Sequence, residues 1–180
     1  MLEQKKDAKF KEVVLYSSIN KDLLGTRKIG LARTDFGEGG AELLLDALEE
    51  AVGPRVVPAG YALGATGGHC DSTFLPPSLE KAKKEEGVGD GPEELRHQVR
   101  RQRKFGSEVI KVCATGGVFS RNTEPGQPQL SETELRAIAD EAHQWGVRVA
   151  AHAHGAEGIK RAIRAGIDTI EHASLVDDEG

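Results

Sequence analysis

The feature that most constrains the fold is a regular alternation of apolar and amphipathic segments after Arg55. The apolar runs are RVVPAG, EVIKVCATGG, VRVAAHAHG and IDTIEHAS, and each has the length of a buried strand. Segments with helical spacing separate the later runs. Strands that alternate with helices are parallel, because each helix returns the chain to the edge where the previous strand began. The sequence therefore predicts an α/β fold built on a parallel sheet.

The helices of this part of the chain have clear boundaries. The strongest covers 131–146, where Ser131 and Glu134 match a capping box and Gly146 ends the apolar stripe. A second helix is expected over 92–106, with Pro92 in its first turn, and a short one over 156–166. The residues DDEG at 177–180 predict the start of a further helix. Before Arg55 the pattern is weaker: EVVLYSS favours a strand and AELLLDALEEAV a helix.

Composition excludes several classes of protein. The 180 residues carry a net charge of −5, which gives no argument for binding nucleic acid or an anionic membrane. No apolar stretch reaches the roughly 18 residues of a membrane span, and the first residues lack the apolar core of a signal peptide. Cys70 and Cys113 fit a reducing compartment better than a disulfide scaffold, so we expect a cytoplasmic protein in which Cys113 is a small core residue.

Three of the apolar runs carry a residue able to bind a metal near their C-terminal end. These residues are Lys111, His152 and His172. In a parallel barrel the C-terminal strand ends meet on one face, where active sites lie. Histidine nitrogen is a good ligand for zinc and similar ions. A lysine ammonium would repel a cation, but its amine can react with carbon dioxide to give an anionic carbamate.

Longer motifs carry a family resemblance. The segments GPRVVPAGYALGATGGH, VIKVCATGGVFS and RVAAHAHGAEGIKRAIRAGIDTIEHAS resemble the amidohydrolase superfamily, in the imidazolonepropionase-related branch that includes the Xaa-Pro dipeptidases (prolidases). The resemblance covers about residues 53–180, and residues 1–52 match poorly. It implies a metal-dependent hydrolase with a (β/α)8 TIM barrel that holds one or two divalent metal ions, with zinc expected.

The resemblance also implies roles for individual residues. Lys111 would be the carbamylated lysine of strand four, a catalytic group that bridges the metals, while His152 and His172 would be the metal ligands of strands five and six. His69 matches a position that contacts substrate. His154 would lie near the barrel mouth, where it touches substrate or supports a ligand, although plain loop polarity explains both His69 and His154 almost as well.

Some features of the family are missing. The family holds its first metal largely by a His-x-His pair on strand one, whereas no histidine precedes His69 here. The family's catalytic aspartate comes from strand eight, and this sequence ends just after strand six. The segment GLARTDFGEGG faintly resembles the strand-two motif, with Arg33 or Asp35 at its polar position. We therefore expect a single domain over 1–180 that forms a partial barrel, about strands two to six.

Three functions follow as hypotheses. The first is a metal-dependent hydrolase that cleaves carbon–nitrogen amide bonds in a small molecule or an Xaa-Pro-like dipeptide. The second is a catalytically inactive barrel fragment that acts as a binding or assembly module, for example as a homo-oligomer that buries its open strand edges. The third is a phosphate-binding barrel in which the backbone amides of ATGG, 114–117, hold the anion.

Overall fold

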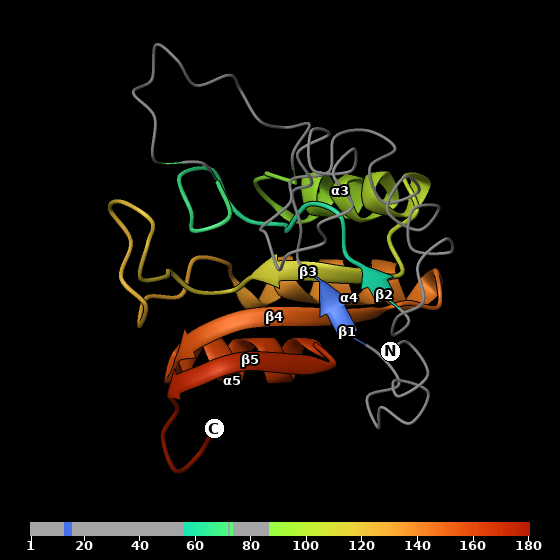
Figure 1. The fold of residues 1–180 in the computed structure, drawn as a ribbon. Coiled ribbons are helices and arrows are strands. Elements are labelled where there is room, and N and C mark those ends of the chain that lie inside the picture. The colour runs from blue at the N-terminus through green and yellow to red at the C-terminus, as the bar shows by residue number, and fades with distance from the viewer. Residues whose placement is uncertain (1–12, 16–55, 72, 74–86) are drawn as a thin grey trace, which may run out of the picture.

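A parallel sheet with helical crossovers forms the centre of the molecule. The computed structural model describes residues 13–15, 56–71, 73 and 87–180 (Figure 1). Three parallel strands, β3 (Val109–Cys113), β4 (Arg148–Gly155) and β5 (Thr169–Leu175), lie side by side in that order. Helix α4 (Glu132–Gln144) connects β3 to β4, and α5 (Ala156–Ala165) connects β4 to β5. The predicted α/β class and parallel sheet are confirmed.

Earlier segments extend this arrangement on the β3 side. Strands β1 (Val13–Leu15) and β2 (Val56–Pro58) pair in parallel. The residues that follow β2 reach β3, since Leu63 N–H donates to Lys111 O and Cys113 N–H donates to Leu63 O, both at 2.8 Å. Near the start of β3, Glu108 N–H donates to Pro58 O at 2.8 Å. Segment 56–63 therefore lies beside β3, and the strands follow one another across the fold in chain order.

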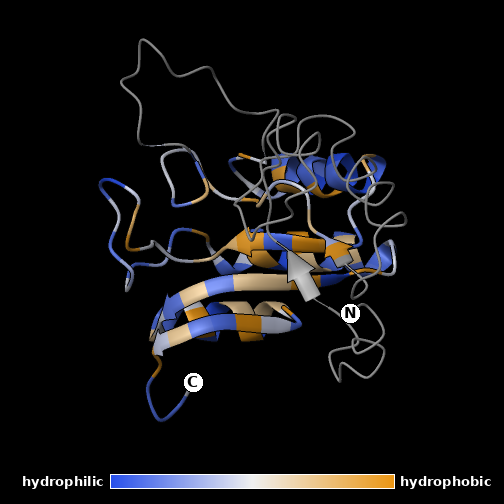
Figure 2. Cartoon of the chain, in the orientation of Figure 1, coloured by the Kyte–Doolittle hydropathy of each residue, from blue (hydrophilic) through white to orange (hydrophobic). Residues whose placement is uncertain are grey.

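The core lies between the sheet and the helices that cover it. All five residues of β3 are buried, and its Ile110 and Val112 side chains pack in one cluster with those of α4 and of α3 (Pro92–Lys104). Figure 2 shows hydrophobic colour concentrated in β3, while the side of α3 that is turned to the viewer is largely hydrophilic. Each fully buried leucine or isoleucine side chain contributes about 1.5–3 kcal/mol. The members with no exposed surface include Leu63, Leu95, Val99, Ile110, Val112, Leu135 and Ile138.

The helix ends agree with the signals in the sequence. In α4, Ser131 Oγ accepts from Glu134 N–H at 3.3 Å, and Glu134 Oε2 accepts from Ser131 N–H at 2.8 Å, which is the predicted capping box. Helix α3 begins at Pro92, and α5 is followed by Gly166 in the left-handed conformation at φ 88°.

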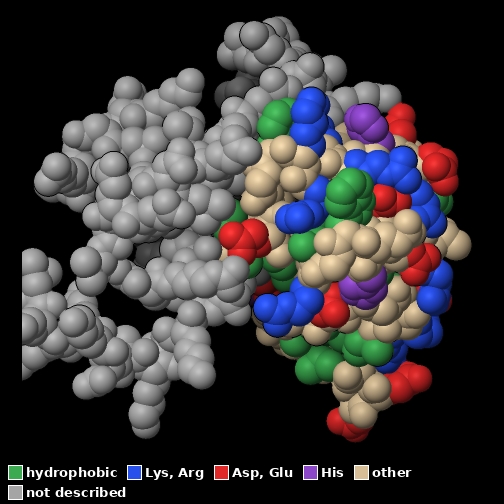
Figure 3. All heavy atoms as spheres, turned by 90° about the vertical axis from the view of Figure 1, so that its right-hand side faces the viewer, with side chains coloured by type: hydrophobic (Ala, Val, Ile, Leu, Met, Phe, Trp, Pro, Cys, Tyr) green, Lys and Arg blue, Asp and Glu red, His purple; other side chains and the backbone are tan. Residues whose placement is uncertain are grey.

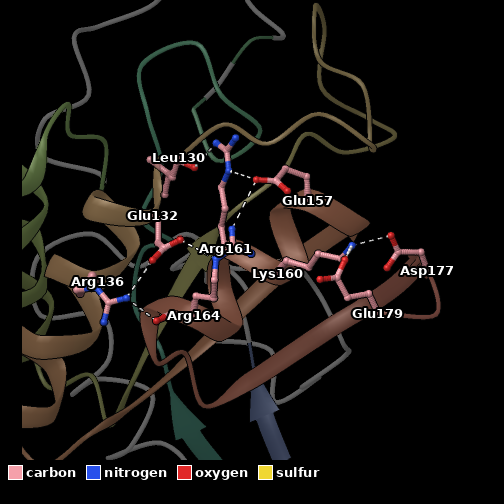
Figure 4. Close-up of polar contacts among 9 residues, drawn as sticks. All are labelled: Leu130, Glu132, Arg136, Glu157, Lys160, Arg161, Arg164, Asp177 and Glu179. Carbon is pink, nitrogen blue, oxygen red and sulfur yellow. Dashed lines mark hydrogen bonds and ion pairs between the residues drawn. The ribbon is translucent and has the colours of Figure 1, made fainter.

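Charged side chains connect the outer helices. Glu132 accepts from Arg136 at 3.0 Å and from Arg164 at 2.8 Å, which joins the start of α4 to α5 (Figure 4). Lys160 of α5 donates to Asp177 and Glu179 at 2.8 and 2.6 Å. Water screens ion pairs of this kind, so they orient these segments more than they stabilise them.

The surface at the end of the sheet where the strands begin carries mixed charge. Figure 3 views the side on which β3, β4 and β5 begin, and acidic and basic side chains intermingle there on the coloured part of the molecule. Within the part of the chain that the structure describes, no helix is both long and apolar enough to cross a membrane.

One expectation from the sequence is wrong. Cys113 is buried in the core as expected, but it also forms a disulfide with Cys70, with their Cα atoms 5.9 Å apart. This pairing removes the argument from cysteine usage for a reducing compartment, because disulfides persist mainly in oxidising ones. Residues 177–180, where the sequence predicts the start of a helix, form a turn closed by Gly180 N–H donating to Asp177 O. The helix expected at 41–52 and the Arg33/Asp35 motif lie outside the described residues.

Candidate functional site

The candidate site lies where β3, β4 and β5 end. The three arrows point to the same side in Figure 1, as parallel strands require. Cys113 is in register with His152, and His152 with Glu171. Residues in register on neighbouring strands share a face of the sheet, and so do Lys111 and Cys113, which are two apart on one strand. Lys111, His152 and Glu171 are therefore on the same face.

Four histidine rings gather at this end of the sheet. The His152 ring stacks on that of His69, with centroids 4.4 Å apart, and meets those of His154 and His172 edge-on at 4.7 and 4.8 Å. The His154 and His172 rings stack at 4.7 Å. One ring nitrogen from each of His152, His154 and His172 lies within 4.8 Å of the other two. These three imidazoles are grouped closely enough to surround a single ion.

His152 is prepared for metal binding by its surroundings. Its Nε2 lies 2.9 Å from Gly116 O, and because a carbonyl only accepts, the proton sits on Nε2 and leaves the Nδ1 lone pair for a ligand. The residue is buried, and burial lowers the pKa of His152 to about 3. The hydrogen bond to the Gly116 carbonyl acts in the opposite direction, because it favours the charged ring, but its effect is smaller than that of burial. His152 is therefore a neutral imidazole at physiological pH, the form that binds metals.

His172 reaches the cluster through an irregular strand. Its register partner is Ala153, so simple alternation would place its side chain on the face opposite to His152. The β4–β5 register shifts between Ala153 and Gly155, and His172 and Ala173 have φ values of 73° and 48°. Left-handed backbone is costly for residues other than glycine and gathers at functional sites. This irregularity turns the His172 ring toward His152, and burial together with the charges of His154 and Lys111 lowers the pKa of His172.

Lys111 has a partner that the sequence analysis missed. The Lys111 side chain is buried and forms an ion pair with Glu171, the residue just before His172. Burial lowers the pKa of Lys111 to about 7 and raises the pKa of Glu171 to about 7. Burial therefore shifts Lys111 toward the uncharged amine, while its ion pair with Glu171 favours the charged form. The only signal for Glu171 in the sequence is an acidic residue inside a strand, which says nothing about its partner.

His69 is held against this cluster by the loop that follows β3. Its backbone N–H donates to Gln129 Oε1 at 2.8 Å, and its Nδ1 shares a hydrogen bond with Ser120 Oγ at 2.9 Å. The ring lies directly against the backbone at Gly117, where a β-carbon would overlap it. His154 has polar contacts of its own: its N–H donates to Thr115 Oγ1 at 3.1 Å, and its Nδ1 lies 2.6 Å from Ser174 Oγ.

Three of the four backbone amides of ATGG have acceptors within the chain. Ala114 N–H donates to His152 O at 2.9 Å, and Gly116 N–H donates to Gln127 O at 3.0 Å. Gly117 N–H points to Thr123 Oγ1 at 3.4 Å. Amides that are already bonded are not available to a phosphate, so this geometry argues against the anion-binding hypothesis.

Comparison with known proteins decides the family. The profile of the Amidohydrolase family matches residues 27–180. The chain belongs to the Amidohydrolase family. Members of this family are hydrolases, so the match confirms the resemblance seen in the motifs around Lys111, His152 and His172.

Individual relatives agree with the family match. An Aspergillus niger ochratoxinase is 41% identical over 141 residues, which are 71% of this chain and 29% of the ochratoxinase. The solved structure of a Xaa-Pro dipeptidase with methionine bound in its active site has 40% identity and a TM-score of 0.73, covering 81% of this chain and 37% of the dipeptidase. A prolidase complexed with N-methylphosphonate-L-proline has 33% identity and a TM-score of 0.71, covering 93% and 48%. The chain therefore spans less than half the length of each of these relatives.

Proposed function

We propose that this amidohydrolase is a metal-dependent hydrolase of carbon–nitrogen amide bonds in small molecules or dipeptides. The observation that carries the proposal is the convergence of His152, His154 and His172 beside Lys111 at the ends of adjacent parallel strands. The relatives support this substrate class, because they include two peptidases of the Xaa-Pro and prolidase type. The substrate would be an amide or dipeptide small enough to reach the end of the sheet.

The donor set fits a divalent metal such as zinc. Imidazole nitrogen is a preferred zinc ligand, and His152 is neutral with one lone pair available. We assign His152 and His172 as ligands, with Lys111 as a third after carbamylation. The hydrogen bond from His152 to the Gly116 carbonyl is the kind of support that fixes the ring of a metal-bound histidine. When bound, the metal would polarise the amide carbonyl and activate water.

Lys111 would change its charge by a balanced reaction. The lone pair of its uncharged Nζ attacks carbon dioxide, a C–N bond forms, and one proton leaves to solvent, which gives an anionic carbamate. The lowered pKa of Lys111 supports this step, because only the uncharged amine is nucleophilic. The product replaces a cation, which would repel the metal, with an anion that attracts it. We therefore propose Lys111 as both metal ligand and catalytic residue.

His69 and His154 are proposed to contact the substrate. The His69 ring stacks on the His152 ring, and the His154 ring meets the His152 ring edge-on. Their imidazoles offer hydrogen bonds to a carbonyl or carboxylate group of a bound dipeptide. In the proposed fold, β2 to β5 correspond to strands three to six of a (β/α)8 barrel in a single domain over 1–180, with strand two preceding them.

The test combines metal analysis with hydrolysis. The protein is expressed in medium that contains zinc and is purified. Its metal content is measured by mass spectrometry, and its hydrolytic activity is assayed on Xaa-Pro dipeptides and N-acyl amino acids. We expect bound zinc in the wild type and its loss in His152→Ala and His172→Ala, while His97→Ala, an exposed residue on α3, keeps it. Equal zinc in all four proteins would refute the site. Protein without zinc or turnover would favour the binding or assembly module.

A further inference from the structure

The disulfide lies next to two residues of the candidate site. Cys70 directly follows His69, and Cys113 is two residues beyond Lys111 on β3 and in register with His152. The bond between them joins residues separated by 43 positions in the sequence. It therefore ties the segment that carries His69 to the strand that carries Lys111.

Three further contacts of His69 come from one loop. Gln129 binds its backbone N–H, Ser120 binds its ring, and Gly117 leaves room for the ring. All three residues lie in the 114–130 connection between β3 and α4. Single hydrogen bonds of this kind contribute little each. The disulfide differs from them because it is covalent and ends on the sheet itself.

The approach of Cys70 to the sheet is supported by a close backbone contact. A β-carbon at Gly64 would lie only 2.9 Å from the β-carbon of Cys70, so Gly64 leaves the space that Cys70 occupies. Leu63, directly before Gly64, bridges to Val112 of β3, while Gly64 itself bonds to the backbone of Gly87 and Gly89. The turn from Gly64 to Cys70 is therefore packed against β3 at its beginning and bonded to β3 at its end.

We propose that the Cys70–Cys113 disulfide is a positioning element that holds the His69 ring on His152, and that its reduction releases His69 from the site. The proposal deepens the proposed function, since it takes His69 as a substrate contact. Cys70 and Cys113 do not touch substrate themselves. They fix where His69 presents its imidazole, so the substrate affinity of the enzyme depends on the oxidation state of this pair.

The redox step is a thiol–disulfide exchange with a dithiol. One thiolate of dithiothreitol attacks the disulfide, and its second thiolate resolves the mixed disulfide. The S–S bond gains two electrons and two protons and becomes two thiols, while dithiothreitol is oxidised to its cyclic disulfide. Removal of the dithiol under air returns the pair to the oxidised state.

Chemical modification of histidine measures the position of His69 directly. The metal-free full chain is treated with diethyl pyrocarbonate before and after reduction, and modification at each histidine is followed by peptide mass spectrometry. We expect the rate at His69 to rise several-fold on reduction, while His97, exposed on α3, reacts at the same rate in both forms. Cys70→Ser and Cys113→Ser should show the raised rate without reductant.

The outcomes separate this proposal from the proposed function. Alkylation counts of the thiols establish that the pair is oxidised before reduction and reduced after it. Equal rates at His69 in the two states would overturn the proposal, as would two free thiols in the untreated protein. In the zinc-loaded protein, reduction should raise KM severalfold with unchanged zinc content and little change in kcat. Loss of zinc binding would count against the proposed function, but the His69 measurement in metal-free protein would still stand.

Discussion

At the scale of single residues, burial determines the charge of the candidate site. An ionisable side chain taken out of water either loses its charge or gains a partner of opposite charge. His152 follows the first course, and its pKa falls to about 3. Lys111 follows both, because it pairs with Glu171 while burial lowers its pKa to about 7. The site therefore carries little fixed positive charge that would oppose a divalent cation.

Gly117 provides a residue-scale test of how closely the site is packed. The variant Gly117→Ala places a methyl group where the His69 ring lies, so the ring must move away from His152. We expect a loss of about 1–3 kcal/mol in the free energy of unfolding, measured with urea. Gly126→Ala is the control, because its β-carbon would meet only Leu175 Cδ1 at 3.7 Å. Equal midpoints for the two variants would show that the His69 ring is not packed in this way.

At the scale of secondary structure, local signals account for most of the elements after Arg55. The capping box at Ser131, Pro92 at the start of α3 and Gly166 after α5 are each visible in the sequence and each found in the structure. The irregularity in β5 was not predictable, because an alternating pattern assumes an unbroken ladder. That pattern would have put Glu171 on the site face and His172 on the other, whereas the register shift and left-handed residues bring both to the site.

The cap of α4 is expected to contribute to stability. In Ser131→Ala, Glu134 N–H loses the hydroxyl oxygen that accepts its hydrogen bond. We expect the free energy of unfolding to fall by about 1 kcal/mol, as is typical for an N-cap serine. Asp140→Ala, an exposed change in the same helix, should leave stability unchanged or slightly raised because alanine favours helix. A matching loss in both variants would mean that the effect does not come from the cap.

Asp168 connects three elements and should give the fold a pH dependence. Asp168 lies just before β5 begins. Its Oδ2 accepts from the N–H of Val149, at the start of β4, at 2.8 Å, and lies 2.9 Å from Nε2 of His143 in α4. Burial disfavours its charged form, but these two bonds outweigh burial and hold the pKa of Asp168 below its usual value. Its contribution to stability is therefore complete above the ordinary carboxyl pKa of about 3.9 and is lost as the pH falls below that value.

The variant Asp168→Asn measures this contribution. Because the amide cannot carry the charge, we expect the variant to be about 1 kcal/mol less stable than the wild type at pH 7. The difference should stay nearly constant down to about pH 5 and shrink between about pH 4 and pH 3. Urea unfolding of both proteins at each pH provides the measurement. A difference that does not change between pH 5 and pH 3 would exclude the carboxylate as its source.

At the scale of the whole molecule, the site exists only because the strands are parallel and adjacent. Lys111, His152 and His172 are predictable as a group, since each lies near the end of an apolar run and such ends meet in a parallel sheet. The Lys111–Glu171 pair and the Cys70–Cys113 disulfide were not predictable. Both depend on the register of neighbouring strands and on the path of the 64–70 turn, and neither is set by spacing along the chain.

Metal binding should therefore act on the stability of the entire fold. A ligand that binds only the folded state stabilises it by about 2.7 kcal/mol at a concentration 100 times its Kd, which for a domain of this size corresponds to a rise in Tm of about 5–10 °C. We expect zinc to raise the Tm of the wild type by this amount, and a chelator to reverse the change. His152→Ala and His172→Ala should lose most of the rise relative to their own metal-free Tm, because each removes one of the converging imidazoles. His97→Ala, changed at an exposed position on α3, should retain it. The same zinc-induced rise in all of these proteins would place the bound ion elsewhere on the molecule and would refute the assignment of the histidine cluster.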